Sequence, residues 1–212
     1  MFIYENIKMP FDRLKKDFAL SDFQLNQFQE YYLFLTHYNK KTNLTSLTNP
    51  KDIYFKHFYD SLLISKTFNF EQINSLCDLG TGAGFPGIPL KILYPNLKVF
   101  LIDSSLKKIN FLELLIKHLH LTNVFVFKEK IEKHKNKYDF VIARALGKLN
   151  LILKLASFVT KDKSYFMAMK GPNYKEEFQD ITQMYQFELK NKFFLQLPEE
   201  YGKRVNLLFQ KK

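Results

Sequence analysis

The chain has 212 residues, 46% of them hydrophobic, which suffices for one domain with a sizeable core and excludes an intrinsically disordered chain. Its single cysteine excludes an internal disulfide framework and a cysteine-rich metal site. The net charge is +11, and it is concentrated in residues 76–212, where 23 Lys and Arg face 13 acids, against nine and eight in residues 1–75. This charge permits binding to a polyanion but does not establish it, because a lysine-rich proteome produces the same value.

No uninterrupted apolar stretch reaches the length of a membrane span. The first ten residues carry Glu5, Asn6 and Lys8 where a signal peptide needs its apolar run. We therefore expect a cytoplasmic protein, a monomer, that involves neither a membrane nor a metal.

The N-terminal third has the pattern of amphipathic helices. In residues 22–39 aromatic and apolar side chains recur every three to five positions, and Ser21 or Asp22 can cap the start. Residues 52–65 repeat the pattern after a proline. No strand signal comes before about residue 74, so we expect a helical extension over residues 1–73, packed on a core domain over residues 74–212.

From residue 75 the pattern changes to alternating strands and helices. Helical periodicity is clearest at 105–119, and the chain ends in two apolar runs, 191–197 and 204–210, parted by a polar turn. Short apolar runs mark expected strands at 75–79, 98–102, 123–127, 138–142 and 164–169. This alternation predicts an α/β fold, a Rossmann-like, mostly parallel sheet with a C-terminal antiparallel hairpin, which is the layout of methyltransferases that use S-adenosylmethionine (SAM).

A glycine-rich turn spans Asp78–Gly87, after an expected strand and before an expected helix. Read from Gly82 it matches the dinucleotide pattern G-x-G-x-x-G, and read from Asp78 it matches the methyltransferase pattern acid-x-G-x-G-x-G. Asp78 suits the cationic amino group of SAM, whereas Pro86 and Pro89 remove N–H donors that the phosphates of NAD would need. Dehydrogenases that use NAD usually need a separate catalytic domain, and this chain has little room for one. These features together favour SAM over NAD.

Asp103 ends the second expected strand about 20 residues beyond the glycines, where an acid hydrogen-bonds ribose hydroxyls. That role serves SAM and NAD equally. The alternative role for Asp103 is to cap the helix that follows, at Ser104-Ser105-Leu106. Cys77 lies in the first expected strand, where it is better explained as core filling than as a nucleophile.

Several separated segments together resemble one family, the small-subunit ribosomal RNA guanine-N7 methyltransferases, also called glucose-inhibited division protein B. The resemblance covers roughly residues 20–210, with Tyr38 where the family usually has tryptophan. The matching segments are Tyr38-Asn39, Thr42–Ser46, His57–Leu62, Asp78–Leu90, Asp103-Ser104 with Lys107-Lys108 and Phe111-Leu112, Phe140–Ala145 and Lys170-Gly171.

The resemblance implies transfer of a methyl group from SAM to N7 of guanine 527, in the 530 loop of 16S ribosomal RNA in the small ribosomal subunit. It also implies which residues form the site. Arg144 would lie beside both cofactor and substrate, Gly80 and Phe85 would line the SAM site, and Ile131 and Glu132 would contact the adenine. Together with Asp103, which ends the second expected strand, these residues form the expected cofactor site. Lys130 and Ile131 replace the usual arginine and small residue, so Glu129 is an alternative to Glu132.

Guanine N7 carries a free lone pair, so its methylation requires no general base and can depend on positioning. The guanidinium of Arg144 could bind phosphate or the O6 edge of guanine, with a surface salt bridge as the alternative. His57 and Asp60 lie on adjacent turns of one expected helix. We assign them to the catalytic group with Arg144, where they would orient the RNA or close over the cofactor. The alternative is a polar pair that only stabilises the helix.

For each of the remaining polar candidates, a structural role is the alternative to a functional one. Asn39 and Asn43 are either functional or turn residues. Phosphate contact or a solvated surface is expected for Lys107, Lys108, Lys203 and Arg204. The other functions considered are SAM-dependent methylation of a different substrate, a non-catalytic RNA-binding protein that retains SAM, and an NAD-dependent oxidoreductase.

Overall fold

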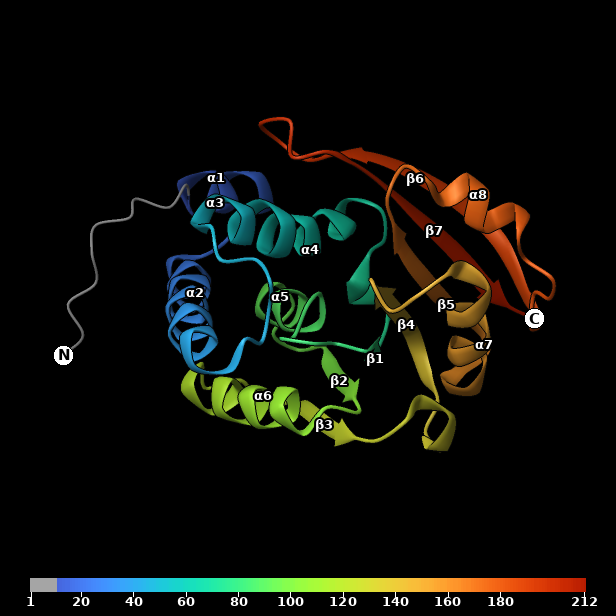
Figure 1. Cartoon of the computed structure of the whole chain (residues 1–212), viewed down its shortest axis with the longest axis horizontal. Helices are drawn as coiled ribbons and strands as arrows, with labels where there is room; N and C mark the ends of the chain where they lie inside the picture. The colour runs from blue at the N-terminus through green and yellow to red at the C-terminus, as the bar shows by residue number, and fades with distance from the viewer. Residues whose placement is uncertain (1–10) are drawn as a thin grey trace.

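The computed structural model describes residues 11–212, and the first ten residues, which begin the expected extension, lie outside this part of the chain. A seven-stranded sheet has the order β3-β2-β1-β4-β5-β7-β6 (Figure 1). Strands β1 to β5 pair in parallel, whereas β7 is antiparallel to both β5 and β6. The strands are β1 Ser75–Leu79, β2 Lys98–Asp103, β3 Val124–Lys128, β4 Tyr138–Arg144, β5 Thr160–Lys170, β6 Phe187–Gln196 and β7 Lys203–Lys211. The predicted parallel sheet with a C-terminal hairpin is confirmed.

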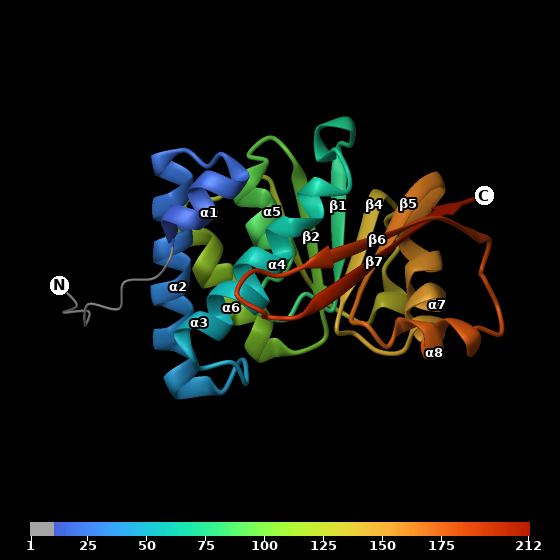
Figure 2. The same ribbon diagram turned by 90° about the horizontal axis from the view of Figure 1, so that it is seen from above.

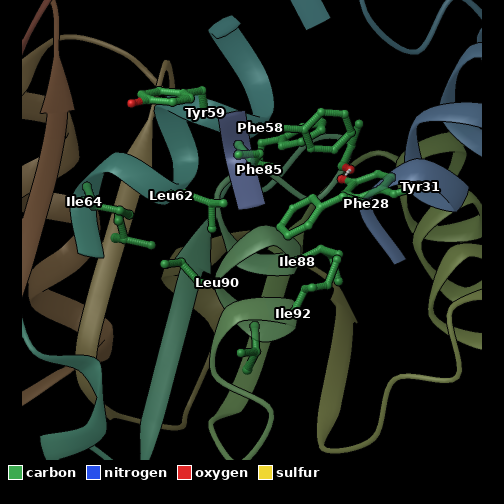
Figure 3. Packing of buried hydrophobic residues seen from close by; sticks show 14 of the residues in the cluster. Phe28, Tyr31, Phe58, Tyr59, Leu62, Ile64, Phe85, Ile88, Leu90 and Ile92 are labelled. Atoms are coloured by element: carbon green, nitrogen blue, oxygen red, sulfur yellow. Dashed lines mark hydrogen bonds between the residues drawn. The ribbon is translucent and has the colours of Figure 1, made fainter. Parts of the chain in front are cut away.

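Helices cover both faces of the sheet (Figure 2). One face carries α1 Phe11–Phe18, α2 Asp22–Thr42, α3 Pro50–Ile53, α4 Asp60–Leu63, α5 Gly87–Leu93 and α6 Leu106–His118, and the other carries α7 Leu149–Val159 and α8 Tyr174–Gln179. On the first face, Phe28, Tyr31, Phe58 and Phe85 lie in one buried cluster together with Ile88 of α5 (Figure 3). The N-terminal helices therefore share their core with the helices of the sheet domain. No helix within residues 11–212 is long and apolar enough to cross a membrane.

Helix α2 begins where the sequence indicates. Ser21 and Gln24 form a capping box, in which the Gln24 N–H donates to Ser21 Oγ at 3.2 Å and the Ser21 N–H donates to Gln24 Oε1 at 2.9 Å. The helix runs to Thr42, three residues beyond the expected end, and stops at Asn43, which adopts a left-handed conformation with φ 47°.

The second expected helix, residues 52–65, is not a regular α-helix. Between α3 and α4 the chain forms a π-helical turn, η1 Tyr54–Tyr59, and after α4 it tightens into the 3₁₀ turn η2 Ile64–Lys66. Hydrophobic periodicity does not distinguish these variants, in which each backbone hydrogen bond spans one residue more or one residue fewer than in an α-helix. The π turn carries His57 immediately before α4. Elsewhere in residues 11–212 the chain forms the short 3₁₀ turns η3 Phe70–Gln72 and η4 Ile131–Lys133.

The strand order reverses between β1 and β4. Leu79 of β1 pairs with Ile102 of β2 on one side and with Ala143 of β4 on the other, so the carboxyl ends of these strands are neighbours. Open α/β sheets bind ligands in the crevice at such a reversal. The glycine-rich turn and Arg144 both leave the sheet at this edge.

Candidate functional site

The glycine-rich turn is held in a backbone conformation that other residues adopt with strain. Gly80 has φ +64°, and a Cβ at this position would lie 2.3 Å from Leu146 Cδ1. Leu146 belongs to the loop that follows β4. A side chain at position 80 would therefore require the Leu146 side chain to move and would strain the backbone at φ +64°.

Asp78 anchors the turn from inside the sheet. The side chain is fully buried, and its Oδ2 accepts hydrogen bonds from Thr81 Oγ1 at 2.7 Å and from the Gly87 N–H at 2.8 Å. Burial raises the pKa of this carboxyl to about 6. The other oxygen, Oδ1, is buried with no hydrogen-bond partner, so it is the atom that could accept from the amino group of SAM.

Asp103 connects the end of β2 to the glycine-rich turn. Its Oδ2 accepts from the Gly82 N–H at 3.0 Å and from Lys108 Nζ at 3.3 Å, and its Oδ1 accepts from the Ser105 N–H at 2.9 Å. The bond to Ser105 holds the turn before α6 and is not a helix cap, because Ser105 is the N-cap residue and no side chain caps this helix. Lys107 Nζ donates to the backbone oxygen of Asn43 at 3.0 Å, so both lysines of this pair are engaged within the protein.

The loop after β3 contains the acids expected near the adenine. Ile131 is buried in the turn η4, and Glu132 is exposed. Glu129 Oε1 lies against His134 Nδ1, and the opposite ring nitrogen of His134 lies against the hydroxyl of Tyr138. Glu129 is thus held in one orientation, whereas Glu132 faces solvent.

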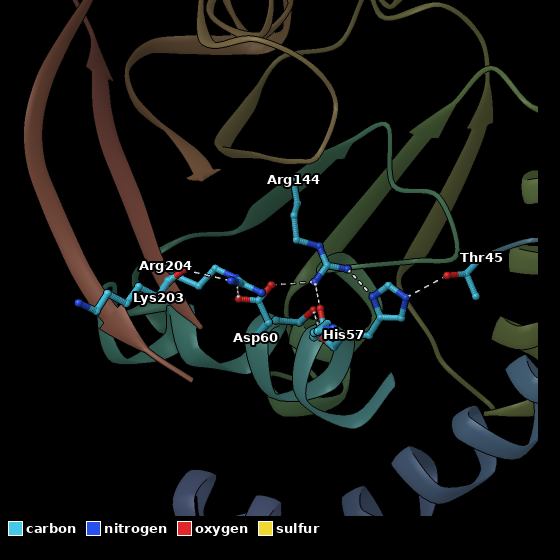
Figure 4. A network of polar contacts seen from close by, with 8 residues as sticks. Thr45, His57, Asp60, Arg144, Lys203 and Arg204 are labelled. Carbon is cyan, nitrogen blue, oxygen red and sulfur yellow. Dashed lines mark hydrogen bonds and ion pairs between the residues drawn. The ribbon is translucent and has the colours of Figure 1, made fainter. Parts of the chain in front are cut away.

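Three predicted residues meet at the carboxyl end of β4 (Figure 4). Arg144 Nη1 donates to the Lys56 carbonyl at 2.9 Å and to Asp60 Oδ2 at 3.1 Å, and Nη2 donates to His57 Nδ1 at 3.2 Å. Asp60 Oδ1 accepts from Arg204 Nε at 2.9 Å. The buried carboxylate of Asp60, 4% exposed, therefore neutralises one of the two guanidinium groups. Arg144, Arg204 and Asp60 together carry one net positive charge.

The contacts of His57 fix its tautomer. Arg144 has only donors, so His57 Nδ1 accepts and Nε2 carries the proton that it donates to Thr45 Oγ1 at 3.2 Å. Burial, together with the charge of Arg144, lowers the pKa of His57 to about 3. His57 is neutral at physiological pH and positions Arg144.

Phe85 joins this cluster to the glycine-rich turn. Its ring stacks on His57 on one face, with centroids 4.3 Å apart, and on Tyr31 on the other, 5.1 Å apart. The Arg144 guanidinium carbon lies 5.4 Å from the ring centre. Phe85 is 4% exposed, so it acts in this structure as the packed centre between helix α2, the π turn and Arg144.

A cavity of about 510 Å³ opens beside these residues. It is lined by cations from four parts of the chain, Lys56, Arg144, Lys170 and Arg204, and by the acids Asp60 and Glu177. Lys170 Nζ pairs with Glu177 Oε2 at 2.6 Å. The remaining lining includes the backbone of the loop after β4, so the cavity lies at the carboxyl edge of the sheet.

A family model described as rRNA small subunit methyltransferase G matches residues 24–205. The chain belongs to this family. A ribosomal RNA small subunit methyltransferase G from Aster yellows witches'-broom phytoplasma is 49% identical over 207 residues, which cover 94% of this chain and 98% of the relative. Its counterpart from Staphylococcus epidermidis is 40% identical over 201 residues, which cover 91% of this chain and 84% of that one. The resemblance drawn from the separated motifs is thus confirmed.

Solved structures show the same fold at low identity. A SAM dependent methyltransferase from Aquifex aeolicus aligns with a TM-score of 0.58 at 20% identity and covers 79% of this chain and 96% of that one. A ribosomal protein L11 methylase from Lactobacillus delbrueckii subsp. bulgaricus aligns with a TM-score of 0.56 at 15% identity, over 74% and 79% of the two chains. The fold is that of SAM-dependent methyltransferases, and the prediction of SAM over NAD is confirmed.

The residues at the carboxyl ends of β1 and β2 fit this co-substrate. Asp78 Oδ1 is a buried acceptor without a partner, and Gly82, with φ +63°, has only the Gly80 carbonyl oxygen, at 4.0 Å, near the place of a Cβ. Asp103 lies at the end of β2, next to Gly82. Among residues 11–212 no group of three His, Cys, Asp or Glu side chains could hold a metal ion.

The structure also assigns positions that sequence reasoning treated differently or missed. Asn39 holds Thr45 through both amide atoms, at 3.0 Å and 2.8 Å, and so supports the partner of His57. Lys203 is exposed, whereas its neighbour Arg204 points to Asp60. Glu177 lines the cavity from α8 and was not anticipated, because the segment around it carries no motif. Burial raises the pKa of the Cys77 thiol well above its ordinary value, as expected for core filling.

Proposed function

We propose that this protein transfers a methyl group from SAM to N7 of guanine 527 in 16S ribosomal RNA. Membership of the rRNA small subunit methyltransferase G family supports the class of substrate. The observation that carries the proposal is the position of Arg144, at the end of β4, between the glycine-rich turn and a basic cavity. A donor-rich cation at this place can hold a phosphate or the O6 edge of a guanine.

The charge of the cavity suits a nucleotide. Asp60 and Glu177, together with Asp52, which pairs with Lys56 at 3.0 Å, neutralise three of the four lining cations, so one positive charge remains. Its volume of about 510 Å³ lies within the range of ligand sites. An enzyme that modifies a base needs such a pocket because the base must leave its stack before it can react.

The chemistry demands little beyond orientation. When bound, SAM supplies an electrophilic methyl group, and guanine N7 offers a lone pair without prior loss of a proton. His57 agrees with this requirement, because it is neutral and both of its ring nitrogens are engaged, by Arg144 and by Thr45. His57 and Asp60 therefore act by orienting Arg144. Holding the two reactants in the right geometry can account for several orders of magnitude in rate.

The setting of the reaction completes the proposal. We place the enzyme in the cytoplasm, as a monomer that acts on the small ribosomal subunit, with residues 1–73 as a helical extension and residues 74–212 as the methyltransferase domain. The core shared by α2, the π turn and α5 supports an extension that stays attached to the domain. From the loop after β3, Glu132 would contact the adenine, with Glu129, which His134 orients, as the alternative.

Transfer of labelled methyl groups from SAM tests the proposal. Small subunits from cells that lack the modification should accept close to one methyl group each, whereas subunits that already carry it should accept none. Methylation of a protein or a small molecule, with unlabelled RNA, would indicate a different substrate. SAM binding without any transfer would indicate a non-catalytic RNA-binding protein.

A further inference from the structure

Phe194 is an exposed aromatic residue on an edge strand. It lies on β6 and is 68% exposed, although its neighbours in the hairpin pack into the two cores. Its one aromatic contact is edge-on, with Tyr174 of α8, at 6.2 Å between ring centres and 66° between planes. Tyr174 is itself buried, so the Phe194 ring is supported on one side and open to solvent on the others.

The sheet register places Phe194 close to the cavity. Phe194 pairs with Val205 of β7, and Val205 pairs with Lys170 of β5, which lines the cavity. Two strand spacings of about 4.8 Å separate Phe194 from Lys170, so the distance between their backbones is roughly 10 Å. The nucleotides directly beside a base in the cavity can span this distance along the carboxyl edge of the sheet.

One cation lies on the strand of the exposed ring, and two further cations lie toward the cavity. Lys192, two residues earlier on the same strand, places its Nζ 4.7 Å from the Phe178 ring centre and 5.7 Å from that of Tyr174. On the cavity side, Lys170 pairs with Glu177 and Arg204 pairs with Asp60. A positively charged edge with one open aromatic face complements a polyanion that carries unstacked bases.

We propose that Phe194 stacks on an unpaired base of the RNA next to the target guanine and holds the RNA loop at the cavity entrance. Proteins recognise single-stranded loops of RNA by stacking splayed bases on aromatic side chains in this way. The proposal rests on the proposed function, because it requires RNA as the substrate. It adds a contact that involves neither SAM nor the reacting base.

The kinetic test compares two equally exposed phenylalanines. Phe23 on α2 is also 68% exposed, so Phe23→Ala is the matched control for Phe194→Ala. With unmodified small subunits as substrate, Phe194→Ala should raise KM on the order of tenfold, the loss expected for one stacked base. The kcat and the affinity for SAM should stay at their wild-type values, and Phe194→Trp should retain the wild-type KM. An unchanged KM in Phe194→Ala, or an equal rise in Phe23→Ala, would overturn the proposal.

Photo-crosslinking identifies what Phe194 touches. With p-benzoylphenylalanine in place of Phe194, irradiation of the complex with small subunits should link the enzyme to a nucleotide of 16S ribosomal RNA close to the methylated guanine. A link to a ribosomal protein would show that this face docks a protein, and no link would show that it is free, so either result overturns stacking. If the wild-type enzyme methylates no RNA, the proposed function itself fails; normal methylation with an unaffected Phe194→Ala variant refutes only this inference.

Discussion

Arg144 and Asp60 lie 84 positions apart in the chain and meet at 3.1 Å between Nη1 and Oδ2. Asp60 uses its second oxygen for Arg204 of the C-terminal hairpin, at 2.9 Å. The carboxylate thus orients the arginine that faces the cavity and joins the N-terminal helices to the last strand. This arrangement explains why a helix that precedes the first strand contributes to the site.

Arg144→Ala should lower kcat for methyl transfer on the order of 100-fold, the effect of removing one positioned electrostatic group. Its affinity for SAM should remain close to wild type, because Asp78, Gly80 and Asp103 do not depend on the guanidinium for their hydrogen bonds. Calorimetric titration with SAM and single-turnover assays measure the two quantities. Arg13→Ala, which removes an exposed arginine of α1, is the control. Wild-type turnover in Arg144→Ala would refute a substrate role.

Asp60→Ala should reduce the free energy of unfolding by about 3 kcal/mol, because it leaves two guanidinium groups without their buried partner. Urea unfolding measures this loss. The matched control is Asp162→Ala, whose carboxylate is 69% exposed and pairs with Lys211 at 3.5 Å, and which should cost less than about 1 kcal/mol. If both variants lost the same amount, the shared carboxylate would have no special part in stability.

His57 should make folding sensitive to acid. In the folded chain its pKa is about 3, whereas in the unfolded chain it titrates near 6.5, so between these values the unfolded state binds more protons. Stability contributed by neutral His57 is therefore present above pH 6.5 and is lost as the pH falls toward 3. Asp78, with its raised pKa of about 6, acts in the opposite direction, so the comparison must be between a variant and the wild type.

His57→Gln keeps one acceptor and one donor but does not titrate. The free energy of unfolding, measured in urea at pH 7.5 and pH 5, should fall less between the two values in His57→Gln than in wild type. His120→Asn, which replaces an exposed histidine, should behave as wild type. An identical pH dependence in His57→Gln and wild type would show that folding does not lower the pKa of His57, which would contradict this account.

Gly80→Ala should weaken SAM binding about tenfold, because a Cβ would meet Leu146 Cδ1 at 2.3 Å on a backbone with φ +64°. The Leu146 side chain must move to relieve the contact, and the left-handed backbone of the turn is strained by the added Cβ. Gly171→Ala is the control for SAM binding, because a Cβ there meets nothing within 4 Å. Equal SAM affinity in Gly80→Ala and Gly171→Ala would contradict this account of the turn.

Local patterns in the sequence were sufficient to predict the sheet. Four of the five expected parallel strands, β1 to β4, begin within one residue of their predicted starts. The fifth, β5, begins at Thr160, four residues before its predicted start, because its first four residues are polar or charged and give no apolar signal. The C-terminal hairpin and the start of α2 at its Ser21 cap were also predicted. Alternation, capping residues and turns act over a few positions, so one sequence records them.

The long-range contacts of the site could not be predicted from these patterns. His57 and Asp60 were recognised as neighbours on a helix, but the π turn that carries His57 and the pair between Asp60 and Arg204 depend on tertiary packing. Arg204 was expected to be a candidate for phosphate, and its pairing with Asp60 across 144 positions leaves no trace in local periodicity. Lys107 and Lys108 likewise find partners in other elements.

The atom that receives the methyl group tests the central claim most directly. Unmodified small subunits, incubated with the enzyme and SAM, should yield 16S ribosomal RNA in which chemical cleavage at N7-methylguanine occurs at guanine 527 and at no other new position. Mass spectrometry of the fragment that contains this nucleotide should show one added methyl group. Cleavage at another guanine, or a methyl group on a different atom of guanine 527, would contradict the account.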